Sequence, residues 1–182
     1  MLLLVVLGGG ESGVGTAILG KKKGYNVFVS DKGKINTAYK DVLSHYEIDW
    51  EEETHSEDRI LAADVVMKSP GIPDTVPLVK QLKAKGILVI SEIEFASKYT
   101  DAKIIGITGS NGKTTTTMLT NHMFVGGGLH VGMAGNIGDS FAKMVAQQDY
   151  GYYVLEISSF QLDGIQEFRP DIAVITNLTP DH

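Results

Sequence analysis

Residues 104–115 read Ile-Ile-Gly-Ile-Thr-Gly-Ser-Asn-Gly-Lys-Thr-Thr, an apolar run that leads directly into a glycine-rich loop and then a threonine-rich helix. This order indicates a phosphate-binding loop, in which backbone amides surround phosphate oxygens. Lys113 would then neutralise the terminal phosphates, and the hydroxyl of Thr114 would bind Mg²⁺. The spacing departs from the common G-x-x-x-x-G-K-S/T pattern, because Ile107 stands where the first glycine belongs. The strand and helix on either side favour a subclass of this loop over a chance match.

Short apolar runs recur along the chain. They cover residues 2–7, 25–30, 64–67, 87–90, 103–108, 153–157 and 171–176. Such runs, alternating with helix-like stretches, are typical of parallel sheets covered by helices. The sequence therefore predicts an α/β fold, with a Rossmann-like parallel-sheet domain over residues 1–97. The first part of a P-loop ATPase-type α/β domain follows over residues 98–182.

Composition narrows the possible partners and compartments. The chain has 182 residues, a net charge of -6 and no cysteine, so disulfides and thiolate metal sites are excluded. No basic stripe is present that would bind a nucleic acid backbone. The apolar start lacks the basic lead-in of a signal peptide and is too short to span a membrane. We expect a cytoplasmic monomer that binds neither nucleic acid nor membrane, and we interpret the acidic residues 51–58 as a solvated loop or edge.

A first glycine-rich loop lies at residues 8–13, directly after the first apolar run, and fits G-x-G-x-x-G. Asp31 ends the second run, near the position of the acidic residue that holds a ribose hydroxyl in dinucleotide-binding folds. On this loop alone, an NAD-dependent oxidoreductase would be favoured. Glycine amides at a helix N-terminus bind any pyrophosphate, however, including that of a UDP-sugar. A rigid Ser-Pro-Gly loop at residues 69–71 would face the same crevice, although by itself this tripeptide is more often just a turn.

Two further polar groups follow buried strands. Glu156 ends a strand that we expect beside the phosphate-binding loop, where its carboxylate would complete a Mg²⁺ shell. The last strand delivers a polar loop that ends in Asp181 and His182. A lone histidine is more often structural or solvated than a ligand. Because a domain rarely ends on such a loop, we expect the chain to be a fragment whose second domain is incomplete.

Five motifs in order carry a resemblance to a known family. They are Ser69-Pro-Gly, the loop 108–115, Ala134-Gly-Asn-Ile-Gly, Glu156-Ile-Ser-Ser-Phe-Gln-Leu and Asn177-Leu-Thr-Pro-Asp-His. The loop resembles that of the Mur ligases and of folylpolyglutamate synthetase, which share its unusual glycine spacing. The string 156–162 is similar to that of the D-glutamate-adding branch of the Mur ligases.

The resemblance implies a role for each of several residues. UDP binding falls to Ser12, Asp31 and Lys32, with Ser69, Pro70 and Gly71 along the crevice, and muramoyl binding to Asn136, Ser158 and Gln161. ATP binding falls to Gly109, Ser110, Asn111, Gly112, Lys113, Thr114 and Thr115. Lys113, Glu156 and His182 would be catalytic, and Thr114, Glu156 and His182 would hold metal. Two departures concern the first crevice: Glu11 is an acid near the pyrophosphate site, and Gly33 follows Lys32 where relatives offer an arginine.

The implied reaction is an ATP- and Mg²⁺-dependent amide ligation. ATP would phosphorylate the alanine carboxylate of UDP-N-acetylmuramoyl-L-alanine, and the amine of D-glutamate would attack the acyl phosphate, in peptidoglycan precursor synthesis. The family's third domain lies outside this sequence, so we expect the chain to bind UDP ligands without turnover. Another Mur ligase, or a folylpolyglutamate synthetase-like ligase, is the nearest alternative. An NAD oxidoreductase leaves the second loop unexplained, and a binding-only ATPase module leaves the first crevice unexplained.

Overall fold

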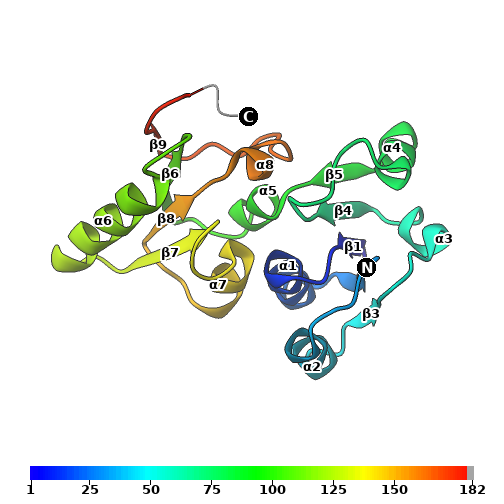
Figure 1. The fold of residues 1–182 in the computed structure, drawn as a ribbon. Helices are drawn as coiled ribbons and strands as arrows, with labels where there is room; N and C mark the ends of the chain where they lie inside the picture. Colours follow the sequence, from blue (N-terminus) through cyan, green and yellow to red (C-terminus); the bar gives the residue numbers. More distant parts are fainter. Residues whose placement is uncertain (180–182) are drawn as a thin grey trace.

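The computed structural model describes residues 1–179, in which strands and helices alternate strictly along the chain (Figure 1). The strands are β1 (Leu3–Leu7), β2 (Asn26–Ser30), β3 (Asp49–Glu51), β4 (Val65–Lys68), β5 (Leu88–Ile90), β6 (Lys103–Thr108), β7 (Val131–Gly135), β8 (Tyr152–Glu156) and β9 (Ile172–Ile175). The helices are α1 (Glu11–Lys22), α2 (Thr37–His45), α3 (Glu57–Ile60), α4 (Pro77–Ala84), α5 (Glu92–Ser97), α6 (Lys113–Gly126), α7 (Phe141–Gln147) and α8 (Ser159–Leu162).

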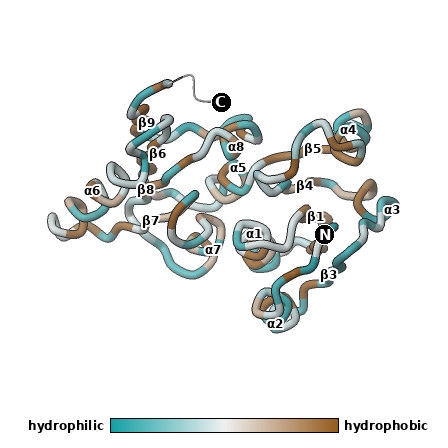
Figure 2. The backbone as a smooth tube through the Cα atoms, in the orientation of Figure 1, coloured by the Kyte–Doolittle hydropathy of each residue, from teal (hydrophilic) through white to brown (hydrophobic). Residues whose placement is uncertain are grey.

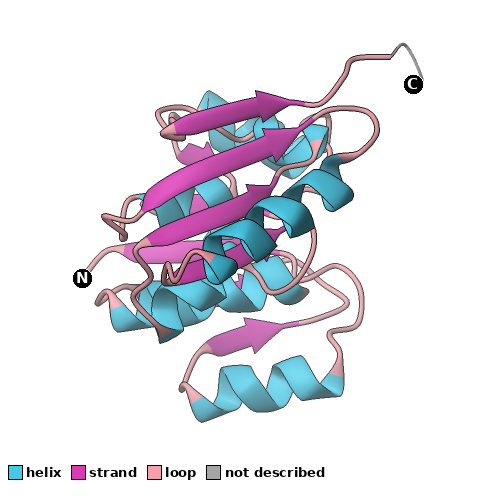
Figure 3. Cartoon of the chain, turned by 90° about the vertical axis from the view of Figure 1, so that its left-hand side faces the viewer, coloured by secondary structure: helices cyan, strands magenta, loops and turns pink. Residues whose placement is uncertain are grey.

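The strands form two parallel sheets, which confirms the predicted α/β class. The first has the order β3-β2-β1-β4-β5 and the second the order β7-β8-β6-β9. Every strand pair is parallel, and Figure 3 shows strands running in one direction with helices packed beside them. In the first sheet, the chain moves outward from β1 to β3 and then returns to place β4 on the other side of β1. This reversal creates a switch point, where open α/β sheets bind ligands at the carboxyl ends of their strands.

The core joins the two sheets through helices. α1 packs against α7, and α5 contacts both of them, so the three helices lie between the sheets (Figure 1). α1 is buried on all sides from Gly13 to Gly20, because the first sheet covers one face and α7 covers another. One apolar cluster therefore contains residues of both halves, and the apolar segments of the strands lie inside the molecule (Figure 2).

Glu94 of α5 ties the first half of the chain to the connection between β8 and β9. Its side chain is fully buried, and Oε2 accepts hydrogen bonds from the backbone amides of Gln166, Glu167 and Phe168 at 2.9–3.0 Å. Burial by itself would raise the pKa of this carboxyl, but the three amides hold it below its ordinary value. A charged side chain is thus used to fix one half of the chain to the other.

Two short strands escaped the sequence analysis. β3 has three residues, one of them tryptophan between two acids, and β7 contains two glycines among its five residues. Both lie at the edge of a sheet, where one side of the strand needs no apolar cover. Because β3 and β7 lack a continuous apolar run, their sequences do not show a recognisable strand pattern.

We place the domain boundary between Ser97 and Lys98 as a proposal. The first sheet ends with β5 at Ile90, and the second begins with β6 at Lys103. α5 lies between them and contacts helices of both halves. In the described part of the chain, no helix is both long and apolar enough to cross a membrane.

Candidate functional site

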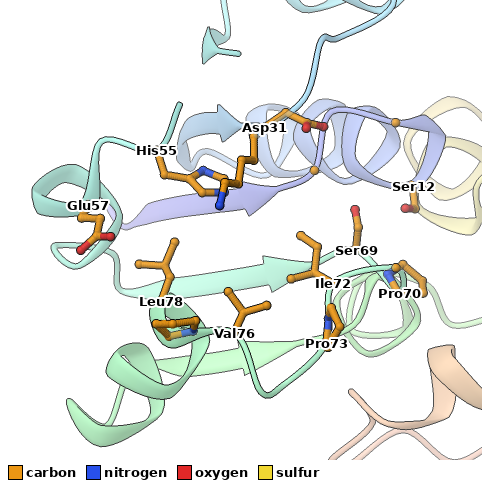
Figure 4. A pocket seen from close by; sticks show the side chains of 15 residues that line it. Ser12, Asp31, His55, Glu57, Ser69, Pro70, Ile72, Pro73, Val76 and Leu78 are labelled. Carbon is orange, nitrogen blue, oxygen red and sulfur yellow. The ribbon is translucent and has the colours of Figure 1, made fainter. Parts of the chain in front are cut away.

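A crevice of about 670 Å³ lies at the carboxyl ends of the first sheet (Figure 4). It brings together all six residues that the sequence analysis assigned to UDP and its crevice: Ser12, Asp31, Lys32, Ser69, Pro70 and Gly71. Gly8, Gly10, His55, Glu57, Ile72, Pro73, Val76, Pro77 and Leu78 complete the lining. We refer to this cavity as the first crevice.

Close packing explains two glycines of the first loop. A Cβ on Gly13 would lie 1.9 Å from the carbonyl oxygen of Gly8, and a Cβ on Gly8 would lie 2.4 Å from Ser69 Oγ. Helix α1 begins after Gly10, and no side chain in residues 1–179 caps it by a hydrogen bond. The first turn therefore retains amide groups that suit an anion, such as a pyrophosphate.

Asp31 fastens this loop to the end of β2. Its Oδ2 accepts a hydrogen bond from the Gly9 amide at 2.6 Å, and its Oδ1 accepts one from the Gly33 amide at 2.7 Å. A carboxylate oxygen has more than one acceptor position, so both can also bind a ligand hydroxyl. Asp31 is consequently a structural anchor of the crevice as well as a predicted ribose contact.

The opposite wall of the first crevice is the turn after β4. Lys68 is buried, and its Nζ donates to the carbonyl oxygen of Ile72 at 2.5 Å and lies 3.3 Å from Asp74 Oδ1. The Ile72 amide donates in turn to the carbonyl oxygen of Ser69 at 3.0 Å. These contacts hold Ser69, Pro70 and Gly71 in a fixed turn.

Glu11 is turned toward the second half of the chain. Its carboxylate accepts a hydrogen bond from Tyr39 at 2.9 Å and lies 3.3 Å from Lys143 Nζ. Lys143 itself is held 2.7 Å from Asp139 Oδ1. Glu11, an acid near the predicted pyrophosphate site, therefore has Lys143 as a cation and Tyr39 as a hydrogen-bond donor.

A second cavity, of about 550 Å³, continues from the first crevice toward the second sheet. The two cavities share Ser12, Pro70 and Gly71. The second also contains Asn136, Ser158 and Gln161, the three residues assigned to the muramoyl group. Its other lining residues are Glu11, Glu92, Gly135, Gly138, Ser140 and Phe160. We call it the second crevice.

Ser158 and Gln161 also have a structural task. They form a capping box at the start of α8, in which the amide and hydroxyl of Ser158 donate to Gln161 Oε1 at 3.0 and 3.1 Å. This arrangement fixes the Gln161 side chain, which is buried. Its two amide hydrogens are not used in the box and are suited to a ligand carbonyl or hydroxyl.

The second glycine loop owes its unusual spacing to a neighbouring strand. Gly109 has a φ of +134°, and a Cβ there would lie 2.2 Å from Thr176 Oγ1 and 2.9 Å from the carbonyl oxygen of Asn177. The segment after β9 presses against the loop at this point. Glycine is therefore required at 109, three residues before Gly112, which has a φ of +83° and caps the N-terminus of α6.

Asn177, which lies outside the second glycine loop, supports that loop through hydrogen bonds. Its carbonyl oxygen accepts from the Ser110 amide at 3.0 Å, and its Oδ1 accepts from the Asn111 amide at 3.0 Å. Its Nδ2 donates to the Asn111 carbonyl oxygen at 2.8 Å. Asn177 belongs to one of the motifs that carry the resemblance, but no role was predicted for it. Its place after a strand that pairs with β6 was the signal that could have indicated one.

Lys113 bends back over the loop. Its Nζ donates to the carbonyl oxygens of Gly109 at 2.7 Å and Ser110 at 3.1 Å. The ammonium group is thus already positioned above the loop by neutral acceptors, which an anionic phosphate would outcompete. Thr114 follows in the first turn of α6 and is exposed.

Glu156 lies beside the loop and is suited to a metal. It pairs with Ile107 across β8 and β6, and only 1% of its surface is exposed. Its Oε1 accepts from Asn136 Nδ2 at 2.8 Å, whereas Oε2 has no hydrogen-bond partner within residues 1–179. A buried carboxylate oxygen without a donor is costly unless a cation binds it. No group of three or more His, Asp or Glu residues in that range forms a complete metal site, and His182 lies outside the described residues.

Glu92 is a second buried acid, which the sequence analysis did not single out. It lies in the wall of the second crevice, and its Oε1 accepts from Ser140 Oγ at 2.6 Å and from the Ala142 amide at 2.9 Å. Burial raises its pKa to about 7, although these two donors oppose the shift. In sequence it looks like an ordinary first-turn acid of a helix; only the packing of α5 against α7 buries it.

Two adjoining crevices and two glycine-rich loops that each follow a parallel strand and precede a helix are typical of one class, the nucleotide-binding α/β proteins. Family comparisons agree, since the model described as "MurD N-terminal domain" matches residues 4–76 and that described as "Mur ligase middle domain" matches residues 107–182. The chain belongs to the Mur ligase family.

Similar curated proteins carry one name. A UDP-N-acetylmuramoylalanine--D-glutamate ligase of Christiangramia forsetii is 63% identical over 98% of this chain and 40% of its own length. One of Bacteroides fragilis is 58% identical over the whole chain and 41% of its own length, and one of Chlorobium phaeobacteroides is 42% identical over 97% and 39%. The chain thus spans about 40% of the length of these relatives.

Solved structures of related ligases share the fold. The UDP-N-acetylmuramate:L-alanyl-gamma-D-glutamyl-meso-diaminopimelate ligase of Neisseria meningitides has a TM-score of 0.65 and 22% identity, over all of this chain and 62% of its own. The UDP-N-acetylmuramate-alanine ligase of Thermotoga maritima has a TM-score of 0.61 and 21% identity, over all of this chain and 43% of its own. Both likenesses support the architecture.

Proposed function

We propose that the chain provides the UDP-substrate crevice and the ATP loop of a ligase that joins D-glutamate to UDP-N-acetylmuramoyl-L-alanine in peptidoglycan precursor synthesis. The observation that carries this proposal is the connection between the two crevices through Ser12, Pro70 and Gly71. A long ligand with a nucleotide at one end and an acyl group at the other fits such a path. The shared name of the relatives supports the same substrate pair.

The proposed chemistry makes a carboxylate reactive. The alanine carboxylate attacks the γ-phosphorus of ATP, ADP leaves, and an acyl phosphate forms. The amine of D-glutamate then attacks the carbonyl carbon, an amide bond forms, the amine loses a proton and inorganic phosphate leaves. Bringing a carboxylate to a triphosphate places anions side by side, so the reaction depends on positioning and on positive charge.

Residues of this chain would supply both. The amides of Gly109 to Thr115 would surround the phosphates, and Lys113 would move from its two carbonyl acceptors to the phosphoryl oxygens. Asn136, Ser158 and Gln161 would hold the muramoyl part in the second crevice. Ser12, Asp31, Lys32, Ser69, Pro70 and Gly71 would hold the UDP part in the first.

The residues beside the loop fit Mg²⁺. Glu156 offers a buried carboxylate oxygen without a donor in the described chain, and Thr114 offers a hydroxyl. Bound Mg²⁺ would neutralise phosphate oxygens as charge develops. His182 would be a further catalytic metal ligand, as the resemblance implies.

Alternative functions differ in what they explain. An NAD oxidoreductase would use the first crevice and leave the loop at Gly109 to Thr115 idle. A ligase for another amino acid would share both sites, and it is disfavoured by the name the relatives carry. A monomer in the cytoplasm, where ATP and UDP-linked precursors occur, with no nucleic acid or membrane partner, completes the proposal.

Calorimetric titration tests the first half of this function. We expect saturable binding of UDP-N-acetylmuramoyl-L-alanine to the 182-residue chain and none of NADH. Binding of NADH alone would overturn the ligase proposal, because it would mean that the first glycine loop serves a dinucleotide.

A further inference from the structure

Ser30 contacts two polar side chains at the far end of the first crevice. It is fully buried at the end of β2, and its Oγ lies 2.6 Å from Glu51 Oε1 and 2.6 Å from His55 Nδ1. Glu51 belongs to the edge strand β3, and His55 follows it in the turn before α3. Figure 4 shows the His55 ring at the crevice, away from Ser12 and Pro70.

The proton of Ser30 can serve only one of these contacts. An ionised carboxylate only accepts hydrogen bonds, so Ser30 donates to Glu51. Burial would raise the pKa of Glu51, but hydrogen bonds from Ser30 and Ser56 hold it below its ordinary value, so the carboxylate is ionised at neutral pH. Towards His55, Ser30 Oγ is then an acceptor, and His55 Nδ1 must carry the hydrogen.

The hydrogen bonds around Glu51 make this arrangement rigid. The Ser56 amide donates to Glu51 Oε1 at 2.7 Å, and the Ser56 hydroxyl donates to Oε2 at 2.6 Å. Ser56, the residue next to His55, therefore fixes the Glu51 carboxylate, which determines the tautomer of the His55 ring. In the neutral ring, Nε2 then carries a lone pair that can accept a hydrogen bond.

The position of His55 indicates which part of a nucleotide it meets. The pyrophosphate is expected at the start of α1, beside Ser12, and Figure 4 places His55 at the opposite end of the crevice. Val76 and Leu78 line the wall near the imidazole and provide an apolar surface for a base. Asp31, Lys32 and Glu57 are the other charged residues in the lining, and Asp31 is the predicted ribose contact.

We propose that His55 is a ligand-binding residue of the first crevice, and that its Nε2 accepts a hydrogen bond from an O–H or N–H group of the bound nucleoside. The proposal rests on the proposed function, since it presumes a uridine nucleotide in this crevice. Ser30 and Glu51 act as positioning residues, because they fix the tautomer that presents the lone pair. A uridine nucleotide has two kinds of such donor: the ribose hydroxyls and the N3–H of uracil.

Titration of UDP into two matched variants tests the acceptor. His55→Asn keeps a donor near the Nδ1 position and loses the distal acceptor, so we expect about 5- to 10-fold weaker binding. His55→Gln places an amide oxygen near the Nε2 position, so we expect binding within about twofold of the unchanged chain. His122→Asn, on the exposed side of α6, is the control and should not change the affinity.

The outcomes separate the inference from the proposed function. If the unchanged chain binds UDP and His55→Asn binds it equally well, the role of His55 is wrong and the crevice assignment stands. Equal losses of UDP affinity in His55→Asn and His55→Gln would also overturn the role of His55, because the amide oxygen of glutamine would then fail to restore binding. If the unchanged chain binds no UDP, the proposed function itself fails.

Two further measurements bear on the tautomer and the donor. The ¹⁵N shifts of His55 should report hydrogen on Nδ1 in the unchanged chain, and a predominantly Nε2-protonated ring would overturn the tautomer. 2′-Deoxy-UDP, 3′-deoxy-UDP and N3-methyl-UDP identify the donor. If His55→Asn no longer weakens the binding of one analogue, the group missing from that analogue is the donor to His55. If the substitution weakens the binding of all three analogues as much as that of UDP, the proposed hydrogen bond is wrong.

Discussion

Gly15 of α1 lies directly against Ser140 at the start of α7, so that a Cβ on Gly15 would be 2.0 Å from Ser140 Oγ. The two helices come from opposite halves of the chain, and the second crevice opens beside this contact. Glu92 holds Ser140 in place, because its carboxylate accepts a hydrogen bond from the Ser140 hydroxyl at 2.6 Å. The joint between the halves is therefore a close helix contact with little room for adjustment.

Gly15→Ala should destabilise the chain by about 2–4 kcal/mol, because the added methyl group must push α7 away from α1. Urea unfolding measures the change in the free energy of unfolding. Gly10→Ala is the matched control, since a Cβ there meets no atom of the described chain within 4 Å. Equal stability of the two variants would contradict the close contact.

Gly109→Ala should weaken ATP binding by at least about tenfold, because alanine is strained at a φ of +134° and its Cβ would collide with Thr176. Titration with ATP and Mg²⁺ gives the affinity, and UDP binding should remain unchanged. Gly126→Ala is the control, because Gly126 is the last residue of α6 and an added Cβ there would meet no described atom within 4 Å. An unchanged ATP affinity in Gly109→Ala would argue against this loop as the phosphate site.

Glu156→Gln should raise the stability of the free chain while removing much of the Mg²⁺ dependence of ATP binding. The change removes a buried charge whose Oε2 has no hydrogen-bond partner within residues 1–179, and it removes a ligand that a divalent cation would need. Thermal unfolding without metal, and ATP titrations with and without Mg²⁺, measure the two effects. A full Mg²⁺ effect in the variant would exclude Glu156 as a ligand.

Glu92 should make the chain less stable as pH rises. Its pKa is raised from 4.5 to about 7, so between these values the folded state holds more protons than the unfolded state. The destabilisation is absent below about pH 4.5 and complete above about pH 7, with an upper bound of about 3 kcal/mol. Glu92→Gln should remove this slope.

Glu94→Gln provides the comparison, since the pKa of Glu94 is lowered. Glu94 contributes stability above its unfolded pKa that is lost as the pH falls, so its replacement should destabilise the chain most near neutral pH. Urea unfolding between pH 4.5 and 8 checks both variants. Parallel pH profiles for Glu92→Gln and the unchanged chain would show that Glu92 does not titrate as described.

The amino-acid sequence by itself determined the parallel α/β class, seven of the nine strands found within residues 1–179, and the two glycine loops. These features follow from local requirements: short apolar runs need cover on both faces, and tight loops beside phosphates need glycine. Because parallel strands deliver their following loops to one edge, the sequence also indicated that the first glycine loop, Asp31 and the turn at residues 69–71 would meet at one crevice, and the resemblance to the Mur ligases added Ser12 and Lys32.

Only the tertiary structure decided what depends on contacts between distant segments. Strands β3 and β7 form because a neighbouring strand pairs with them, although their own sequences are weakly apolar. The direction of Glu11, the burial of Glu92 and the support of the second glycine loop by Asn177 come from contacts between residues far apart in the sequence, which no local pattern connects. The tertiary structure also decided the contacts of Ser30 with Glu51 and His55. These hydrogen bonds connect two strands and a turn, so they exist only after the sheet has assembled.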